Sequence, residues 1–255
     1  MSYLLYCIFR QPVPEVVKIP DDEFVGRVFT VNYDGLGAAL SELARSDEPP
    51  DPSQLLAFER VVESFYSHST VIPMRYGCRV GDPHDAVILL RDNQDACRAV
   101  LRQLEGLAEM GIQVLLDNRM HGLGTDRLAR LPEWFPSRSG ISGTAYLDST
   151  KVGRHSARPR TTVQHALVEN LCGRLHGSSI RHKVELTSSG GSRLLSLYFL
   201  VPCGSVEAFR FAARHFFADK SREARIEGPW PPYNFVEALQ TQVGAQGGSL
   251  ENRPL

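Results

Sequence analysis

The order of apolar patterns in the second half of the chain constrains its fold most strongly. From Glu109 onward, patterns typical of strands and of helices follow one another in the order strand, helix, strand, strand, helix, strand. That order is typical of the split β-α-β arrangement of a ferredoxin-like sandwich. The first half contains similar parts in a different order: three strands, a helix, a strand and further helices. We therefore predict an α+β protein with two domains.

The boundary between the two domains is expected near residue 107. Residues 1–107 are predicted to form a modified α+β sandwich, and residues 108–236 a ferredoxin-like β-α-β-β-α-β sandwich. Residues 237–255 are rich in glycine and polar side chains, so they offer too little apolar surface to offset the entropy lost on ordering. We expect them to form a flexible tail.

Local signals predict several elements of the first domain. The apolar run Tyr3–Phe9 predicts a strand buried on both faces, and Asp34-Gly35 predicts the tight turn of a hairpin. Pro52 follows a possible capping aspartate and predicts the first turn of a helix. In the segment STVIPMRYG, Pro73 cannot donate a hydrogen bond to a neighbouring strand. We therefore expect that strand to lie on a sheet edge or to end at the proline.

The stretch GPWPPYNFV, from Gly228 to Val236, is too rich in proline for a helix or an ordinary strand. Proline fixes its own backbone and pushes the preceding residue to extended angles, so a stiff bar is predicted from Gly228 to Pro232. At about three residues per turn, Trp230 and Tyr233 would project on the same side of this bar. We expect Trp230 to be buried in the core of its own domain. We expect Tyr233 to be half-buried, with its hydroxyl at the surface.

Charge and composition exclude several classes of protein. The formal net charge is −1, which attracts the chain neither to nucleic acid nor to an anionic membrane. No run approaches the roughly 18–20 apolar residues of a membrane span, and no basic lead precedes the first apolar run. The five cysteines include no C-x-x-C pair, and Cys97 lies in the apolar stripe of a predicted helix, which indicates a buried thiol. We expect a cytoplasmic protein that binds no nucleic acid, no membrane and no cofactor.

Four polar residues resemble a metal site at first sight. His165, Glu169, Cys172 and His176 share the polar face of one predicted helix, opposite its predicted inward stripe of Val163, Leu167, Leu171 and Leu175. The two histidines would lie about 16 Å apart, too far to share an ion, so only one pair from this stripe could form half a site. We predict no metal ligands here and interpret the stripe as a solvated or domain-facing surface.

The chain contains no recognisable catalytic set, so we predict that it is not an enzyme. Arg75 is a candidate of another kind, because an arginine after an apolar edge strand can bind a carboxylate, stack on a ring or form a surface salt bridge. The alternative is an enzyme or small-ligand-binding protein. Its site would lie between the domains and be built from Arg75, His121 and the Cys172–His176 pair.

Four segments resemble motifs of the gas vesicle protein GvpF/GvpL family. They are VIPMRYG (Val71 to Gly77), EMGIQV (Glu109 to Val114), SGTAYL (Ser142 to Leu147) and GPWPPYNFV. Their order and spacing also resemble that family, from the N-terminal YLLYCIF to Val236, which covers nearly the whole chain. The proline-rich motif is specific, whereas VIPMRYG alone is a weak signal.

The resemblance implies an accessory protein for building gas vesicles, the gas-filled protein shells of buoyant or sporulating prokaryotes. It implies two α+β domains, a location in the cytoplasm and on the gas vesicle, and binding to the small hydrophobic shell protein during assembly. Other gas vesicle accessory proteins are further expected partners, and some family members are regarded as minor vesicle components. The residues expected to bind a partner are Arg75, Tyr76, Trp230, Tyr233, Asn234 and Phe235.

Overall fold

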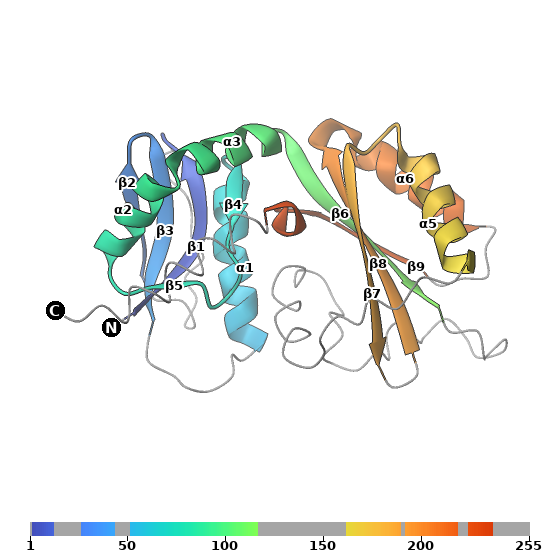
Figure 1. The fold of residues 1–255 in the computed structure, drawn as a ribbon, viewed down its shortest axis with the longest axis horizontal. Helices are drawn as coiled ribbons and strands as arrows, with labels where there is room; N and C mark the ends of the chain where they lie inside the picture. Colours follow the sequence, from blue (N-terminus) through green and yellow to red (C-terminus); the bar gives the residue numbers. More distant parts are fainter. Residues whose placement is uncertain are drawn as a thin grey trace. The chain divides into compact units, whose positions relative to one another are not determined.

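The computed structural model describes residues 2–12, 27–43, 52–116, 162–189, 192–218 and 224–236 (Figure 1). These residues form two compact units. The first unit holds residues 2–105 together with 231–236, and the second holds the described residues from 106 to 230. The first boundary lies close to the expected residue 107, but residues 231–236, which we expected in the second domain, belong to the first unit. The tail predicted for residues 237–255 lies outside the described residues.

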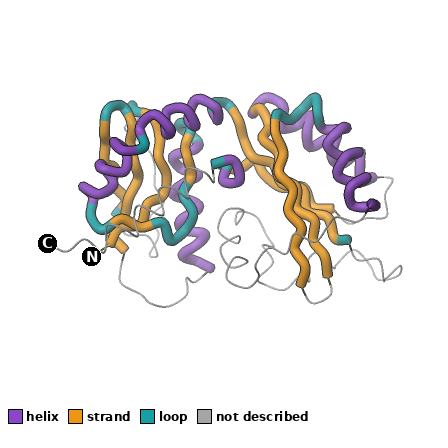
Figure 2. Tube along the Cα trace, in the orientation of Figure 1, coloured by secondary structure: helices purple, strands orange, loops and turns teal. Residues whose placement is uncertain are grey.

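The first unit is built on a sheet whose central strand is β1 (Figure 2). Its strands are β1 (Ser2–Arg10), β2 (Val28–Tyr33), β3 (Leu36–Leu43), β4 (Val71–Pro73) and β5 (Arg79–Val80). Their order is β2-β3-β1-β4, with β5 also paired to β1, and all pairings are antiparallel. The predicted hairpin turn is confirmed, because Asp34 and Gly35 have φ angles of 41° and 76°. Pro73 ends β4 at the sheet edge, as predicted.

Helices cover both faces of this sheet because β1 is apolar on both faces. The helix α1 (Pro52–Tyr66) begins at the predicted proline and packs on one face. With β1 and its neighbours it forms the first core, which consists of Leu4, Tyr6, Cys7, Phe9, Ala39, Phe58, Val61, Val62, Phe65, Val71 and Tyr233. The helices α2 (Pro83–Asp92) and α3 (Gln94–Leu104) contact the same sheet but add no described residue to that core. They therefore cover the opposite face, and Cys97 of α3 is fully buried, as predicted.

The second unit is built on another antiparallel sheet, with the strand order β7-β8-β6-β9. Its strands are β6 (Leu107–Leu115), β7 (Arg181–Ser189), β8 (Ser192–Pro202) and β9 (Ala224–Trp230). The helices are α5 (Thr162–Leu175) and α6 (Val206–Ala218), and α6 follows the short turn η2 (Cys203–Ser205). Both helices pack on the side of the sheet that holds the alternate residues Met110, Ile112 and Val114 of β6.

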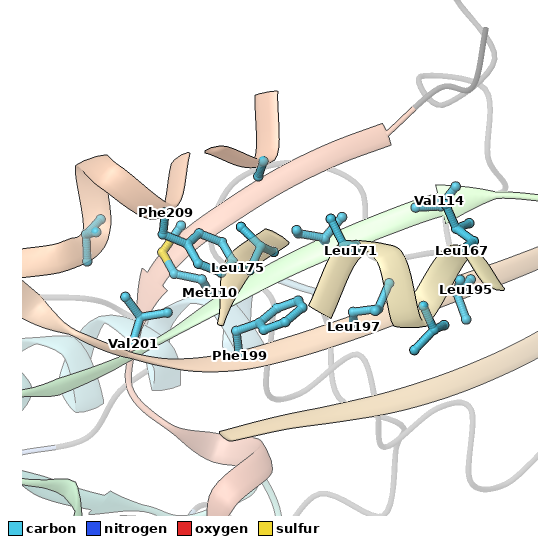
Figure 3. Close-up of a cluster of buried hydrophobic side chains, with 14 residues drawn as sticks. Met110, Val114, Leu167, Leu171, Leu175, Leu195, Leu197, Phe199, Val201 and Phe209 are labelled. Atoms are coloured by element: carbon cyan, nitrogen blue, oxygen red, sulfur yellow. The ribbon is translucent and has the colours of Figure 1, made fainter. Parts of the chain in front are cut away.

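The buried side chains between this sheet and its two helices form the second core (Figure 3). The predicted leucine stripe of α5 is confirmed, because Leu167, Leu171 and Leu175 are all buried there. The full set is Met110, Ile112, Val114, Leu167, Val168, Leu171, Leu175, Leu195, Leu197, Phe199, Val201, Val206, Phe209 and Ala213. Each unit therefore has its own hydrophobic core.

The proline-rich stretch does not form one continuous bar. Its first three residues are the end of β9, where Trp230 pairs with Glu109 across a bulge in the β6–β9 ladder. Gly228 in this bulge has a φ of 103°, outside the extended region that we predicted. After Pro232, the residues of η3 (Tyr233–Phe235) form a tight helical turn. The predicted bar is wrong because a glycine before proline can adopt angles that other residues avoid.

We expect Gly228→Ala to lower the free energy of unfolding by about 2 kcal/mol or more. An added Cβ would lie 2.6 Å from the backbone oxygen of Glu109, and the positive φ of 103° disfavours any side chain. Gly173→Ala is the control, because Gly173 lies in α5 with nothing within 4 Å of an added Cβ. That change should stabilise the protein by about 0.5–1 kcal/mol. Denaturant unfolding measures both; equal midpoints for Gly228→Ala and the parent would contradict the assigned geometry.

Candidate partner-binding site

Stacked aromatic rings join β1 to α1 in the first unit. A bulge in the middle of β1 shifts the alternation of its side chains, so Tyr6 and Phe9 face the same side of the sheet. The ring of Tyr6 stacks on Phe58 with centroids 4.8 Å apart, and Phe9 stacks on Phe65 at 5.1 Å. Each such pair adds about 0.5–1.5 kcal/mol beyond the burial of apolar area. These four rings form a buried layer between β1 and α1, which we call the aromatic floor.

The floor is uncharged across the physiological pH range. The hydroxyl of Tyr6 lies 2.8 Å from Ser41 Oγ, and burial raises the pKa of Tyr6 to about 12. A phenol that keeps its proton at neutral pH provides packing and one hydrogen bond. The floor is therefore buried, uncharged packing that supports the half-buried residues beside it.

Tyr76 lies at the rim of this floor, in the connection between β4 and β5. The chain is fixed there by the Met74 N–H, which donates to the Tyr6 carbonyl at 2.8 Å. The ring of Tyr76 meets Phe58 edge-on, at 5.4 Å and 77°, and its hydroxyl donates to Gln54 Oε1 at 3.4 Å. Both Tyr76 and the adjacent Arg75 are half-buried. The rim thus presents an aromatic edge and a guanidinium on a fixed backbone.

The segment 231–236 contains a second group of candidates and brings Tyr233 into the first core. Tyr233 is only 4% exposed and belongs to the first core, so our expectation that its ring is half-buried is wrong. Asn234 is also buried, whereas Phe235 remains half-buried. Backbone hydrogen bonds from the Tyr233 N–H to Pro231 O (2.8 Å) and from the Phe235 N–H to Pro232 O (3.2 Å) hold the turn. Phe235 is therefore the aromatic residue of this segment that a partner can reach.

Trp230 lies in the second unit and differs from its expected core position. It is half-buried, and among the described residues it does not belong to the second core. Its ring lies over Gly111 of β6, where a Cβ on that glycine would come within 2.8 Å of the indole. The absence of a side chain at Gly111 therefore makes room for the indole on the sheet. Trp230 and Tyr233 pack in different units and do not share one surface of a bar.

Of the residues of the alternative site, Arg75 belongs to the first unit, and Cys172 and His176 belong to the second. His165 and Glu169 form an exposed pair at 3.4 Å on α5, and Cys172 packs against the second core instead of joining the polar stripe. Within the described ranges, no group of three or more His, Cys, Asp or Glu side chains is arranged to hold a metal. His121 lies outside those ranges.

Sequence reasoning missed one exposed aromatic residue. Phe211 of α6 is 72% exposed, and we did not single it out from the sequence. The signal was available, because Val206, Phe209 and Ala213 define the buried face and Phe211 falls about 200° away from Phe209 on the helix. The exposure of Phe211 also makes it a suitable control position for substitutions in the cores.

Comparisons with known proteins agree on one family. A family model described as "Gas vesicle synthesis protein GvpL/GvpF" matches residues 2–237. Gas vesicle protein F1 of Halobacterium salinarum is 25% identical over 226 residues, covering 87% of each chain. Gas vesicle protein F2 of the same strain is 25% identical over 227 residues, covering 87% of this chain and 86% of the relative.

Two solved structures have the same fold. The gas vesicle protein GvpF from Anabaena sp. PCC7120 superposes with a TM-score of 0.67 at 19% identity, over 92% of this chain and 96% of that chain. GvpF from Microcystis aeruginosa gives a TM-score of 0.63 at 15% identity, over 92% of this chain and 98% of that one. In the part of the chain that the structure describes, no helix is long and apolar enough to cross a membrane.

We expect Tyr233→Ala to lower the free energy of unfolding by about 3–5 kcal/mol, because it empties a buried aromatic site. Trp230→Ala should cost less than half as much, since its ring is half-buried. Phe211→Ala, at a residue 72% exposed, is the control and should change stability by no more than about 0.5 kcal/mol. Denaturant unfolding of the three variants checks this ranking. A larger loss for Trp230→Ala than for Tyr233→Ala would restore the order expected from the sequence.

Proposed function

Because this chain belongs to the GvpL/GvpF family of gas vesicle synthesis proteins, we propose that it is a non-enzymatic assembly factor that binds the small hydrophobic shell protein. The observation that carries the proposal is the family match over residues 2–237, which spans both units. The fold shared with two GvpF structures supports it. A role in gas vesicle synthesis follows from the family itself; shell-protein binding is our proposal.

A physical need supports an interaction with the shell protein. A small subunit with a large apolar face is prone to aggregate before it enters an assembly. A partner that covers such a face keeps the subunit soluble until it is incorporated. Recognition of this kind uses shape and apolar contact, which the half-buried rings of Tyr76 and Phe235 offer. The stacked rings of the aromatic floor are buried and support Tyr76 through Phe58.

We assign the direct contacts to the half-buried candidates. Arg75, Tyr76 and Phe235 combine a guanidinium with two aromatic rings, the side-chain types enriched at binding hot spots. Tyr233 and Asn234 are buried, so their assigned role is to hold the segment 231–236 in place. Trp230 is a separate candidate contact on the second unit.

Two further proposals concern location and partners. The chain remains with the finished vesicle as a minor component and contacts other gas vesicle accessory proteins in the cytoplasm. Family membership supports both statements. Recovery of this chain with washed vesicles tests the first, and its co-purification with accessory proteins from a vesicle-forming strain tests the second.

We also infer that the second unit is a ferredoxin-like β-α-β-β-α-β sandwich. The order β6, α5, β7, β8, α6, β9 supports this, as does the antiparallel sheet order β7-β8-β6-β9. Both helices pack on one face of that sheet, as a two-layer sandwich requires. The first unit differs, because its sheet is covered on both faces.

We expect the shell protein to be captured by this chain and to stay in the supernatant when the two are co-expressed. Arg75→Glu should reduce the captured shell protein by about 10-fold, the size of effect expected of a binding hot spot. Arg79→Glu is the matched control, because Arg79 is exposed on β5 nearby and carries the same charge. The assigned surface is supported if the parent chain and Arg79→Glu capture the shell protein equally well and Arg75→Glu captures about 10-fold less. No capture by the parent chain would refute the proposed function.

A further inference from the structure

The described edge strands of the two sheets differ in how well they are protected from pairing with another chain. β4 is fully buried, and β5 carries an exposed arginine. β7 carries Lys183 and Glu185, and β9 carries Arg225 and Glu227. Charged side chains and burial are the usual protection of sheet edges. β2, by contrast, contains neither a charged residue nor a proline between Val28 and Tyr33.

The outer edge of β2 carries backbone groups that no strand of the described ranges pairs with. Among the described residues, β2 pairs only with β3. Residues that flank a two-residue hairpin turn exchange both backbone hydrogen bonds, and the pattern alternates along the strand. Since Tyr33 pairs with Leu36 beside the turn, Thr30 and Asn32 direct their backbone N–H and C=O groups away from β3. Both residues are exposed.

This edge is held in place before any partner arrives. Helix α2 contacts β2 along one face of the sheet. Arg98 of α3 donates to the Asp34 carbonyl at 2.7 Å and to Asp34 Oδ2 at 2.9 Å, and Gln94 also donates to Asp34. A partner that adds a strand to an ordered edge loses less conformational entropy on binding than one that must first order the edge.

We propose that the outer edge of β2 receives an extended, uncharged segment of the shell protein as an added β-strand. The inference rests on the proposed function, which supplies the partner. Main-chain hydrogen bonds provide the affinity in strand addition, and the character of the edge selects the segment. An edge without charge gives a charged segment no counter-ion, so it favours an apolar segment.

The size of the edge favours the shell protein over a second copy of this chain. Six residues of strand extend about 20 Å. That contact alone falls short of the roughly 1,200 Å² of a stable interface, so β2 pairing with its own copy would be weak. The shell protein is held also at Arg75 and Tyr76, so its strand would add at high effective concentration.

Pro and Lys substitutions at Thr30 test the proposal. Thr30→Pro removes an outward N–H without removing a bond to β3, and Thr30→Lys places a charge on the edge. Thr30→Val retains the N–H, and Thr187→Lys places the same charge on the edge strand β7. We expect both test variants to capture at least about 10-fold less shell protein, and both controls to match the parent. In the parent complex, amide exchange at Thr30 and Asn32 should slow.

The outcomes separate this inference from the proposed function. If the parent captures the shell protein, and Thr30→Pro and Thr30→Lys are folded by circular dichroism and capture as much, the proposed strand addition at β2 is wrong. The proposed function then still stands. If Thr30→Pro is unfolded and Thr30→Lys is folded, the amount of shell protein captured by Thr30→Lys tests the proposed strand addition. No capture by the parent would overturn both. If the parent chain sediments as a dimer and the Thr30→Lys variant as a monomer, the edge of β2 pairs with a second copy of this chain. That result would overturn the shell protein as the proposed occupant.

Discussion

The burial of Tyr233 in the first core is the contact on which the organisation of the whole chain depends. Tyr233 follows β9, the last strand of the second unit, yet its ring is 4% exposed among residues of β1 and α1. The second unit is therefore inserted between two parts of the first, which the chain leaves at Glu105 and re-enters at Pro231. As a consequence, the first core is complete only when the residues after β9 are in place.

This organisation gives the candidate residues a fixed base. Tyr76 meets the same ring of Phe58 that stacks on Tyr6, so the rim and the central strand form one packed group. Phe235 is half-buried and lies two residues after Tyr233, which is buried in the first core. Burial keeps the phenol of Tyr6 protonated, with a pKa of about 12, so this group acts through packing. The buried rings therefore support the half-buried rim at Tyr76.

The reading of local patterns predicted the leucine stripe of α5 from its periodicity and the turn at Asp34 from the Asp34-Gly35 dipeptide. It failed at the proline-rich stretch for two physical reasons. Proline statistics describe local angles, whereas the positive φ of Gly228 occurs where the β6–β9 ladder shifts its register, between Glu227 and Trp230. The burial of Tyr233 depends on contacts with β1, more than 200 residues earlier, which no local pattern encodes. The unprotected edge of β2 likewise could not be identified from the sequence, because its identification requires the order of the strands in the sheet.

The central claim is that residues 231–236 complete the first core, and hydrogen exchange in two shortened chains tests it most directly. One chain ends at Trp230 and the other at Val236. We expect the amides of β1 to exchange at least about 10-fold faster in the chain that ends at Trp230, because loss of Tyr233 opens the core. The amides of β6 and β8 should keep their protection in both. Equal protection of β1 in the two chains would contradict the claim.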